Sequence, residues 1–118
     1  MQLTYVIMFV DDMSAGVAFY RDTLGLPLRF ASPEWTEFNT GPTTLALHPS
    51  SKDNPAGMTR LGFRVADMQA CRSRLEHAGV TFTREPAPEH GVLLAEFVNP
   101  AGVRFSLSAP AEAQSARQ

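Results

Sequence analysis

The chain has 118 residues, of which 44% are hydrophobic and 19% charged, with a formal net charge of -2 at neutral pH. This length and apolar content predict one globular domain and argue against disorder. The charge provides no basic surface for nucleic acid, and no apolar run approaches the roughly 20 residues that span a bilayer. The single cysteine, Cys71, excludes an internal disulfide and a cysteine metal site. Residues 1–9 lack the basic region and cleavage site of a secretory signal, so we expect a cytoplasmic protein.

The first half of the chain predicts one strand, one helix and three further strands. Residues 2–10 are apolar and rich in β-branched and aromatic side chains, as is typical of a strand. Asp11 or Asp12 can cap the helix that follows, and Gly25 can end it. The apolar face of this helix is expected to hold Met13, Val17, Tyr20 and Leu24. The three further strands are expected at residues 28–31, 35–40 and 43–48.

The same order of elements returns after a polar linker at residues 50–57. A strand is expected at 59–65, followed by a helix that Asp67 caps and Gly79 closes. The apolar face of this second helix is expected to hold Met68, Cys71, Leu75 and Ala78. The last three strands are expected at residues 80–84, 92–98 and 103–108. The segment around Asp12 matches the segment around Asp67 at an offset of 55 residues, so we interpret the chain as an internal repeat.

Strands and helices mixed in this way predict an α+β domain built from two βαβββ modules, with the helices on one face of each sheet. We expect a single domain over residues 1–118. Its parts are module 1 at about 2–49, module 2 at about 58–109 and a polar tail at 110–118. The sheet face opposite the helices must then be covered or line a cavity.

Two motifs resemble the vicinal-oxygen-chelate family, which includes glyoxalases, bleomycin-resistance proteins and dioxygenases. Residues 19–26, FYRDTLGL, look like the family's first helix, and residues 96–102, EFVNPAG, look like its second-module hairpin. The resemblance covers about residues 3–108. It implies two modules that form a curled mixed sheet around a cleft. It also implies a homodimer, with modules paired either within one chain or between two.

The metal-dependent members of that family place four ligands in the cleft. In this chain the resemblance puts those positions at Tyr5, Ala46, Arg60 and Ser106. None of these is a His or a carboxylate, and a permanently charged arginine repels a divalent ion. We therefore expect no metal, no other cofactor, and neither glyoxalase nor ring-cleaving dioxygenase chemistry, both of which need the ion. The alternative is an offset metal site that uses His48 with Glu37 or Glu96.

Strand alternation identifies the side chains that would face the cleft. The predicted ligand-binding set is Tyr5, Ile7, Trp35, Glu37, Ala46, His48, Arg60, Glu96, Arg104 and Ser106. The positions predicted to face the helices are Val6, Met8, Phe38, Leu45, Leu47, Leu61, Phe63, Phe97, Phe105 and Leu107. Within the ligand-binding set, aromatic rings can stack on flat ligands, carboxylates attract cations, and arginines bind anionic oxygens.

Several of these residues also have a purely structural interpretation. Trp35 can cover the cleft mouth or a dimer seam, and His48 can be a solvated strand end. Glu37 and Glu96 can form plain ion pairs with Arg60 or Arg104. Cys71, on an apolar helical face, is expected to be a buried small residue.

These features support three hypotheses. The first is a metal-independent protein that binds a small, partly aromatic molecule, with antibiotic sequestration as one example. The second is a metal-free isomerase, lyase or hydrolase in which His48 or a cleft carboxylate is the general base, Tyr5 the acid and Arg60 the oxyanion partner. The third is a structural module whose own side chains fill the cleft. We expect no nucleic-acid or membrane partner, and the sequence identifies neither the ligand nor a catalytic residue.

Overall fold

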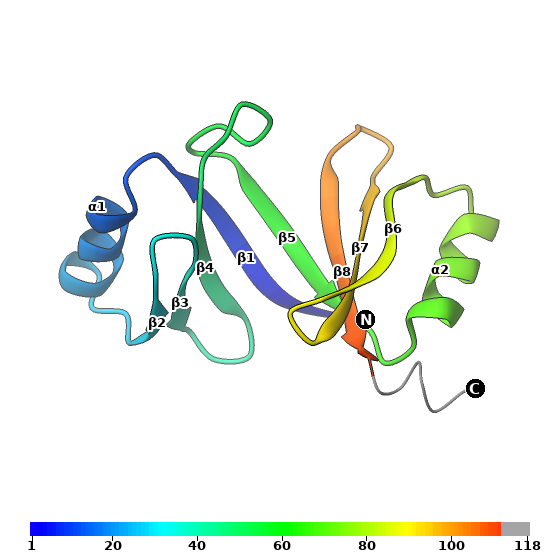
Figure 1. Ribbon diagram of the computed structural model, residues 1–118, viewed down its shortest axis with the longest axis horizontal. Coiled ribbons are helices and arrows are strands. Elements are labelled where there is room, and N and C mark those ends of the chain that lie inside the picture. The colour runs from blue at the N-terminus through cyan, green and yellow to red at the C-terminus, as the bar shows by residue number, and fades with distance from the viewer. Residues whose placement is uncertain (112–118) are drawn as a thin grey trace. The chain divides into compact units, whose positions relative to one another are not determined.

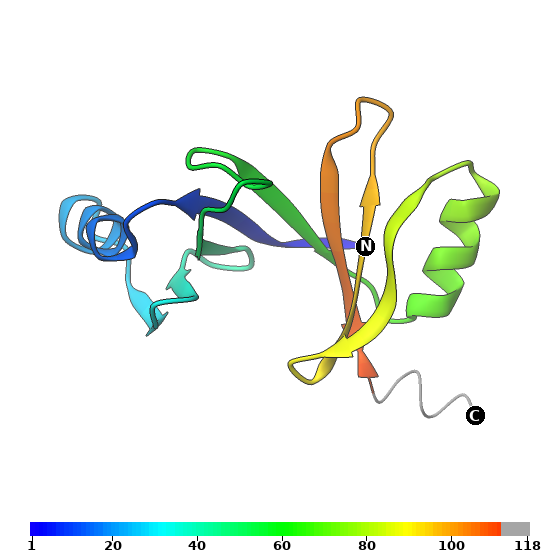
Figure 2. The same cartoon turned by 45° about the horizontal axis from the view of Figure 1, so that its top comes forward.

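The computed structural model describes residues 1–111 (Figure 1). The chain forms two compact units, each with four strands and a helix, and the strands follow the order β2-β3-β4-β1-β5-β8-β7-β6 in one sheet. The first unit is Thr4–Arg60, and the second combines Met1–Leu3 with the chain from Leu61 onward. Figures 1 and 2 show each helix beside strands of its own unit. The α+β class and the twofold use of one order of elements are as predicted. The predicted tail lies outside the described residues from position 112.

The first unit is built on a mixed sheet in the order β2-β3-β4-β1, with β1 parallel to β4 and the other pairs antiparallel. Its elements are β1 (Gln2–Val10), α1 (Met13–Ala18), a π-helical turn η1 (Phe19–Thr23), β2 (Leu28–Ala31), β3 (Thr36–Asn39) and β4 (Thr44–Pro49). Asp12 caps α1, because its carboxylate accepts the backbone N–H of Ala15 at 3.0 Å. Gly25 follows the helical run with φ of 74°, a conformation that glycine adopts without strain.

The predicted apolar face of the first helix is wrong at its last position. The α-helix gives way to η1, in which the N–H of Leu24 bonds to the carbonyl of Phe19, five residues earlier. This wider turn rotates Leu24 off the helical face, and its side chain is 53% exposed. Tyr20 keeps its predicted place, since its ring packs 5.8 Å from that of Phe38.

The second unit repeats this plan with strands in the order β5-β8-β7-β6 and β5 parallel to β8. Its elements are β5 (Thr59–Arg64), α2 (Met68–His77), β6 (Phe82–Glu89), β7 (Val92–Val98) and β8 (Arg104–Pro110). Asp67 caps α2 through the N–H of Ala70 at 3.1 Å. The backbone dihedral angles of Asp67, φ -131° and ψ 105°, are close to those of Asp12, φ -126° and ψ 102°. The two caps are therefore equivalent positions of an internal repeat.

The second unit corrects several predicted boundaries, and β8 runs to Pro110, the first residue of the predicted tail. The strand expected at 80–84 is β6, which runs to Glu89 because an edge strand tolerates the missing N–H groups of Pro86 and Pro88. The helical face ends at Leu75, since Ala78 is the exposed C-terminal cap of α2.

Each unit has its own core between helix and sheet. Phe38 and Leu47 are fully buried in the first unit, and the hydroxyl of Thr36 reaches the sulfur of Met13 at 3.4 Å. In the second unit the buried cluster consists of Met68, Cys71, Ala95, Leu107 and Ala109. Cys71 is thus buried as expected, and the predicted helix-facing positions are confirmed where they are fully buried, at Phe38, Leu47 and Leu107.

The outer strands β2 and β6 both carry irregularities in their register. On β2, Leu28 lies opposite Phe38 but Phe30 lies opposite Glu37, so Arg29 is an extra residue. On β6 the register shifts on both sides of Arg84. A bulge of this kind redirects a side chain relative to strict alternation. Within residues 1–111, no helix has the length and apolar content needed to cross a membrane.

Candidate functional site

One face of the first unit's sheet gathers aromatic and polar side chains. The register pairs Tyr5 with Thr44, Ile7 with Ala46, and Ala46 with Glu37. Residues paired across strands share a face, so these side chains lie opposite the buried Phe38 and Leu47. We call this surface the Glu37 face and define it by Tyr5, Ile7, Phe9, Arg29, Trp35, Glu37, Thr44, Ala46, His48 and Arg60.

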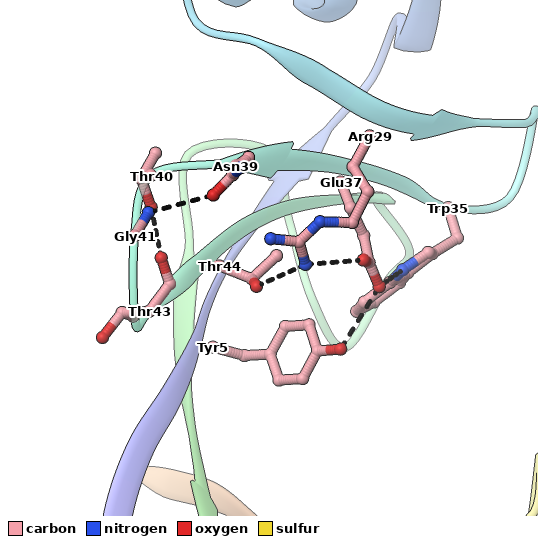
Figure 3. A network of polar contacts seen from close by, with 9 residues as sticks. All are labelled: Tyr5, Arg29, Trp35, Glu37, Asn39, Thr40, Gly41, Thr43 and Thr44. Atoms are coloured by element: carbon pink, nitrogen blue, oxygen red, sulfur yellow. Dashed lines mark hydrogen bonds and ion pairs between the residues drawn. The ribbon is translucent and has the colours of Figure 1, made fainter.

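The carboxylate of Glu37 joins Tyr5, Trp35 and Arg29 in a polar network on this face (Figure 3). Its Oε2 accepts hydrogen bonds from the Tyr5 hydroxyl at 3.2 Å and from Trp35 Nε1 at 2.8 Å. Its Oε1 lies 3.4 Å from Arg29 Nη1, which also donates to Thr44 Oγ1 at 2.9 Å. The Glu37 side chain is only 17% exposed, so water screens these contacts weakly. The carboxylate therefore fixes the two rings that donate to it.

Four rings follow one another across the face. The Tyr5 and Trp35 rings meet edge to face at 5.9 Å, and the Trp35 and His48 rings do so at 6.2 Å. His48 in turn tilts against Phe9 at 5.3 Å. The Nδ1 atom of His48 lies 2.8 Å from the carbonyl oxygen of Pro49. Because a carbonyl only accepts, Nδ1 donates, and Nε2 of the neutral ring is left as an acceptor.

Arg60 is a buried cation at the Phe9 end of the face. It is 9% exposed, and its guanidinium carbon lies 5.6 Å from the centroid of the Phe9 ring. Its Nη2 donates to Asn54 Oδ1 at 2.9 Å. The linker is therefore not purely solvated, because Asn54 is half-buried and positions a predicted site residue.

The four positions that correspond to family metal ligands do not fit a divalent ion. Ala46 is fully buried and has only a methyl group, and the Tyr5 hydroxyl donates to Glu37. Arg60 carries a permanent positive charge. Ser106 lies on β8, opposite Glu96, and would be the only remaining oxygen donor. In the part of the chain that the structure describes, no group of three or more His, Cys, Asp or Glu side chains is arranged so that it could hold a metal ion.

The other predicted site residues lie in the second unit. Glu96 faces Ser106 across the β7–β8 pair, and Arg104 faces Val98. Strand alternation puts Glu96, Arg104 and Ser106 on one face of this sheet. Glu96 also lies 3.9 Å from Nη1 of Arg84, whose Nη2 forms an ion pair with Glu89.

Three residues of the Glu37 face, Phe9, Arg29 and Thr44, lie outside the predicted ligand-binding set. Strand alternation from Ala46 puts Thr44 on the cleft side. Phe9 could have been found, because alternation from Tyr5 and Ile7 leads directly to it. Arg29 could not, since the bulge that turns it toward Glu37 leaves no mark in the sequence. The structural interpretation of Glu37 as a plain ion pair named Arg60 or Arg104 as the partner, whereas the structure pairs Glu37 with Arg29 at 3.4 Å.

Two surface hollows lie apart from the predicted site residues. One, of about 660 Å³, is beside Met13, Arg21 and Pro33, and one of about 330 Å³ is beside Met68 and Arg72. Arg21 also donates to the exposed Asp22 at 2.8 Å, and this hydrogen bond lowers the pKa of that carboxyl. Neither hollow is lined by any of the ten predicted residues.

Comparisons with known proteins place this geometry in a family. A family model described as the Glyoxalase/Bleomycin resistance protein/Dioxygenase superfamily matches residues 2–107. No curated protein matches the sequence. Among solved structures, the chain is similar to methylmalonyl-CoA epimerase from Mycobacterium tuberculosis, with 21% identity and a TM-score of 0.75. That match covers 97% of this chain and 91% of the epimerase.

Two further structures show the same likeness. A superfamily member from Vibrio splendidus 12B01 has 13% identity and a TM-score of 0.70, over 92% of this chain and 97% of that one. A protein described as NAD-dependent benzaldehyde dehydrogenase from Legionella pneumophila has 16% identity and a TM-score of 0.73, over 90% and 97%. At these identities the likeness establishes the fold alone. With the family model matched over residues 2–107, the chain belongs to the Glyoxalase/Bleomycin resistance protein/Dioxygenase superfamily.

Proposed function

We propose that the protein binds a small, partly aromatic molecule without a metal ion, with the Glu37 face as the binding surface. Sequestration of a toxic compound such as an antibiotic is the role that such binding would serve. The observation that carries this proposal is the pair of hydrogen bonds that fix two aromatic rings. Glu37 Oε2 accepts from Trp35 Nε1 at 2.8 Å and from the Tyr5 hydroxyl at 3.2 Å. A surface whose rings are fixed in advance loses less conformational entropy when a ligand binds.

The exposure of the rings supports binding by stacking. Trp35 and Tyr5 are half-buried and His48 is exposed, so each keeps ring surface for a ligand. Stacking on an aromatic ring contributes about 0.5–1.5 kcal/mol beyond the area buried. The area itself contributes about 25 cal/mol per Å². Glu37 orients the two rings, and its carboxylate already accepts hydrogen bonds from Tyr5, Trp35 and Arg29.

The test begins with a thermal-shift screen of planar aromatic compounds and antibiotics, because a ligand that binds only the folded state raises the melting temperature. Calorimetric titration of each hit then compares variants. Trp35→Ala should weaken binding about tenfold or more, and Glu37→Gln only a few-fold, since a glutamine oxygen still accepts from both rings. Glu34→Gln, at an exposed neighbouring position, is the matched control and should leave affinity unchanged.

The second candidate, a metal-free enzyme, is favoured by one contact. The Tyr5 hydroxyl lies 3.2 Å from Glu37 Oε2, which is an acid and a carboxylate base within proton-transfer distance. Each hit should therefore be incubated with the protein and analysed for products by mass spectrometry. If Tyr5→Phe or Glu37→Gln abolished product formation while Trp35→Ala retained it, the binding hypothesis would be wrong and the enzyme would replace it.

A further inference from the structure

We infer that Arg29 makes the Glu37 face selective for aromatic ligands that carry a carboxylate. The inference rests on the proposed function and names the ligand class of the same surface. Arg29 is not in the ligand-binding set predicted from the sequence. The β2 bulge brings it to the Glu37 face.

The guanidinium of Arg29 is anchored at one end and open along one edge. Nη1 makes both of its contacts, to Glu37 Oε1 at 3.4 Å and to Thr44 Oγ1 at 2.9 Å (Figure 3). Among residues 1–111, neither Nε nor Nη2 of Arg29 forms a hydrogen bond, and the side chain is 42% exposed. The two N–H donors along one edge of the guanidinium are therefore unused by the protein, on a side chain that is 42% exposed.

This open edge matches a carboxylate. The Nε–H and Nη2–H groups are parallel donors whose spacing fits the two carboxylate oxygens in a bidentate pair. Thr44 is buried and holds the other end of the guanidinium, so little conformational freedom is lost on binding. The rings of Tyr5 and Trp35 donate to the same Glu37 and can hold the flat part of the ligand.

The nearby negative charge of Glu37 does not cancel this preference. Its two oxygens already receive hydrogen bonds from Tyr5, Trp35 and Arg29, which spread the charge over three donors. The contact with Arg29 is long, at 3.4 Å, and uses only Nη1. A ligand carboxylate at the Nε–Nη2 edge of Arg29 therefore lies closer to the donors of the guanidinium than to the Glu37 carboxylate.

The repeat supplies an internal comparison. Arg84 lies 55 residues after Arg29, the same offset that separates the capping Asp12 and Asp67. It also sits at a register irregularity of its outer strand, but it pairs with two carboxylates, Glu89 and Glu96. The equivalent arginine of the second unit is thus neutralised within the protein. Arg29 has one carboxylate partner, Glu37 at 3.4 Å, and keeps Nε and Nη2 for a ligand.

The experiment is calorimetric titration with three probes that share one ring system, namely 2-naphthoate, 2-naphthamide and 2-naphthylmethylammonium. We expect 2-naphthoate to bind about tenfold more tightly than the amide, with the ammonium weakest. Arg29→Met should remove the tenfold preference and change the affinity for the amide less than about threefold. Arg29→Lys should retain part of it, because a lysine keeps the charge but loses the bidentate geometry. Added salt should weaken binding of 2-naphthoate more than binding of the amide.

Arg84→Met is the matched control and should alter the affinity for 2-naphthoate less than about twofold. Unchanged circular dichroism and Trp35 emission verify that each variant is folded. Equal binding of acid and amide to the unmodified protein, or an unaltered preference in Arg29→Met, would overturn this inference and leave the proposed function standing. Tightest binding of the ammonium would also overturn it and would assign recognition to Glu37. No binding of any probe at millimolar concentration would contradict the proposed function itself.

Discussion

Removal of the Glu37 carboxylate should destabilise the fold as well as the face it supports. We consider Glu37→Gln and Glu37→Leu, which take away the charge and the entire acceptor group, respectively. The carboxylate receives three donors, Tyr5, Trp35 and Arg29, while its side chain is 17% exposed. It is therefore mostly out of water, and loss of an acceptor there costs more than on an open surface.

The two substitutions should differ in magnitude. Glutamine keeps one oxygen for the Trp35 and Tyr5 donors but turns an amide N–H toward Arg29. Arg29 is 42% exposed, which limits the value of its ion pair, so Glu37→Gln should lower the free energy of unfolding by about 1 kcal/mol. Leucine removes the acceptor for all three donors, so Glu37→Leu should lower it by about 2–3 kcal/mol.

The assay is urea denaturation followed by fluorescence and far-ultraviolet circular dichroism. Trp35 is the single tryptophan of the sequence, so its emission reports on the Glu37 contact without interference. The control is Glu34→Gln, which removes the same charge at an exposed position nearby and should change stability by about 0.5 kcal/mol or less. If Glu37→Leu were as stable as this control, the hydrogen bonds to Glu37 would not hold the rings, and the reasoning would be refuted.

Three further predictions concern packing, assembly and metal content. A β-carbon at Gly16 would lie 3.1 Å from the Leu47 side chain, which is fully buried. Gly16→Ala should therefore lower the melting temperature, although alanine has the better helix propensity. The decrease should be smaller in a Leu47→Val background, where the crowded side chain is shorter. A higher melting temperature for Gly16→Ala would contradict this. We propose a homodimer, because open sheet edges favour closure by a second copy, and light scattering that gives a monomer mass at micromolar concentration would refute it. Because Tyr5, Ala46, Arg60 and Ser106 occupy the family's metal positions, chelator-treated protein should retain less than one equivalent of divalent metal. Elemental analysis that finds about one metal ion per chain would contradict this.

Local signals in the sequence were sufficient for much of the fold. Asp12 and Asp67 were identifiable as caps because a short acidic side chain before an apolar helical pattern has one common use. Period-two alternation put Glu37 and Phe38 on opposite faces of one strand, and the structure agrees. These features depend only on neighbours in the sequence, which explains why they could be read from it.

Features that depend on tertiary contacts could not be predicted in this way. The π-helical turn after Ala18 displaces Leu24, although the residue spacing fits an ordinary helix. The bulge on β2 gives Arg29 its place beside Glu37, and nothing at residues 28–31 distinguishes a bulged strand from a regular one. The polar linker predicted at residues 50–57 contains Asn54, whose contact with Arg60 exists only in the folded chain.

The outer strands β2 and β6 differ in how well they resist aggregation through their edges. Both are irregular in register, which twists an edge away from pairing with another molecule. β6 also contains Pro86 and Pro88, which offer no N–H to an incoming strand. β2 has no proline and exposes Phe30 by 53% and Leu28 by 39%. In concentrated solution, strand-to-strand aggregation is therefore expected to start at β2.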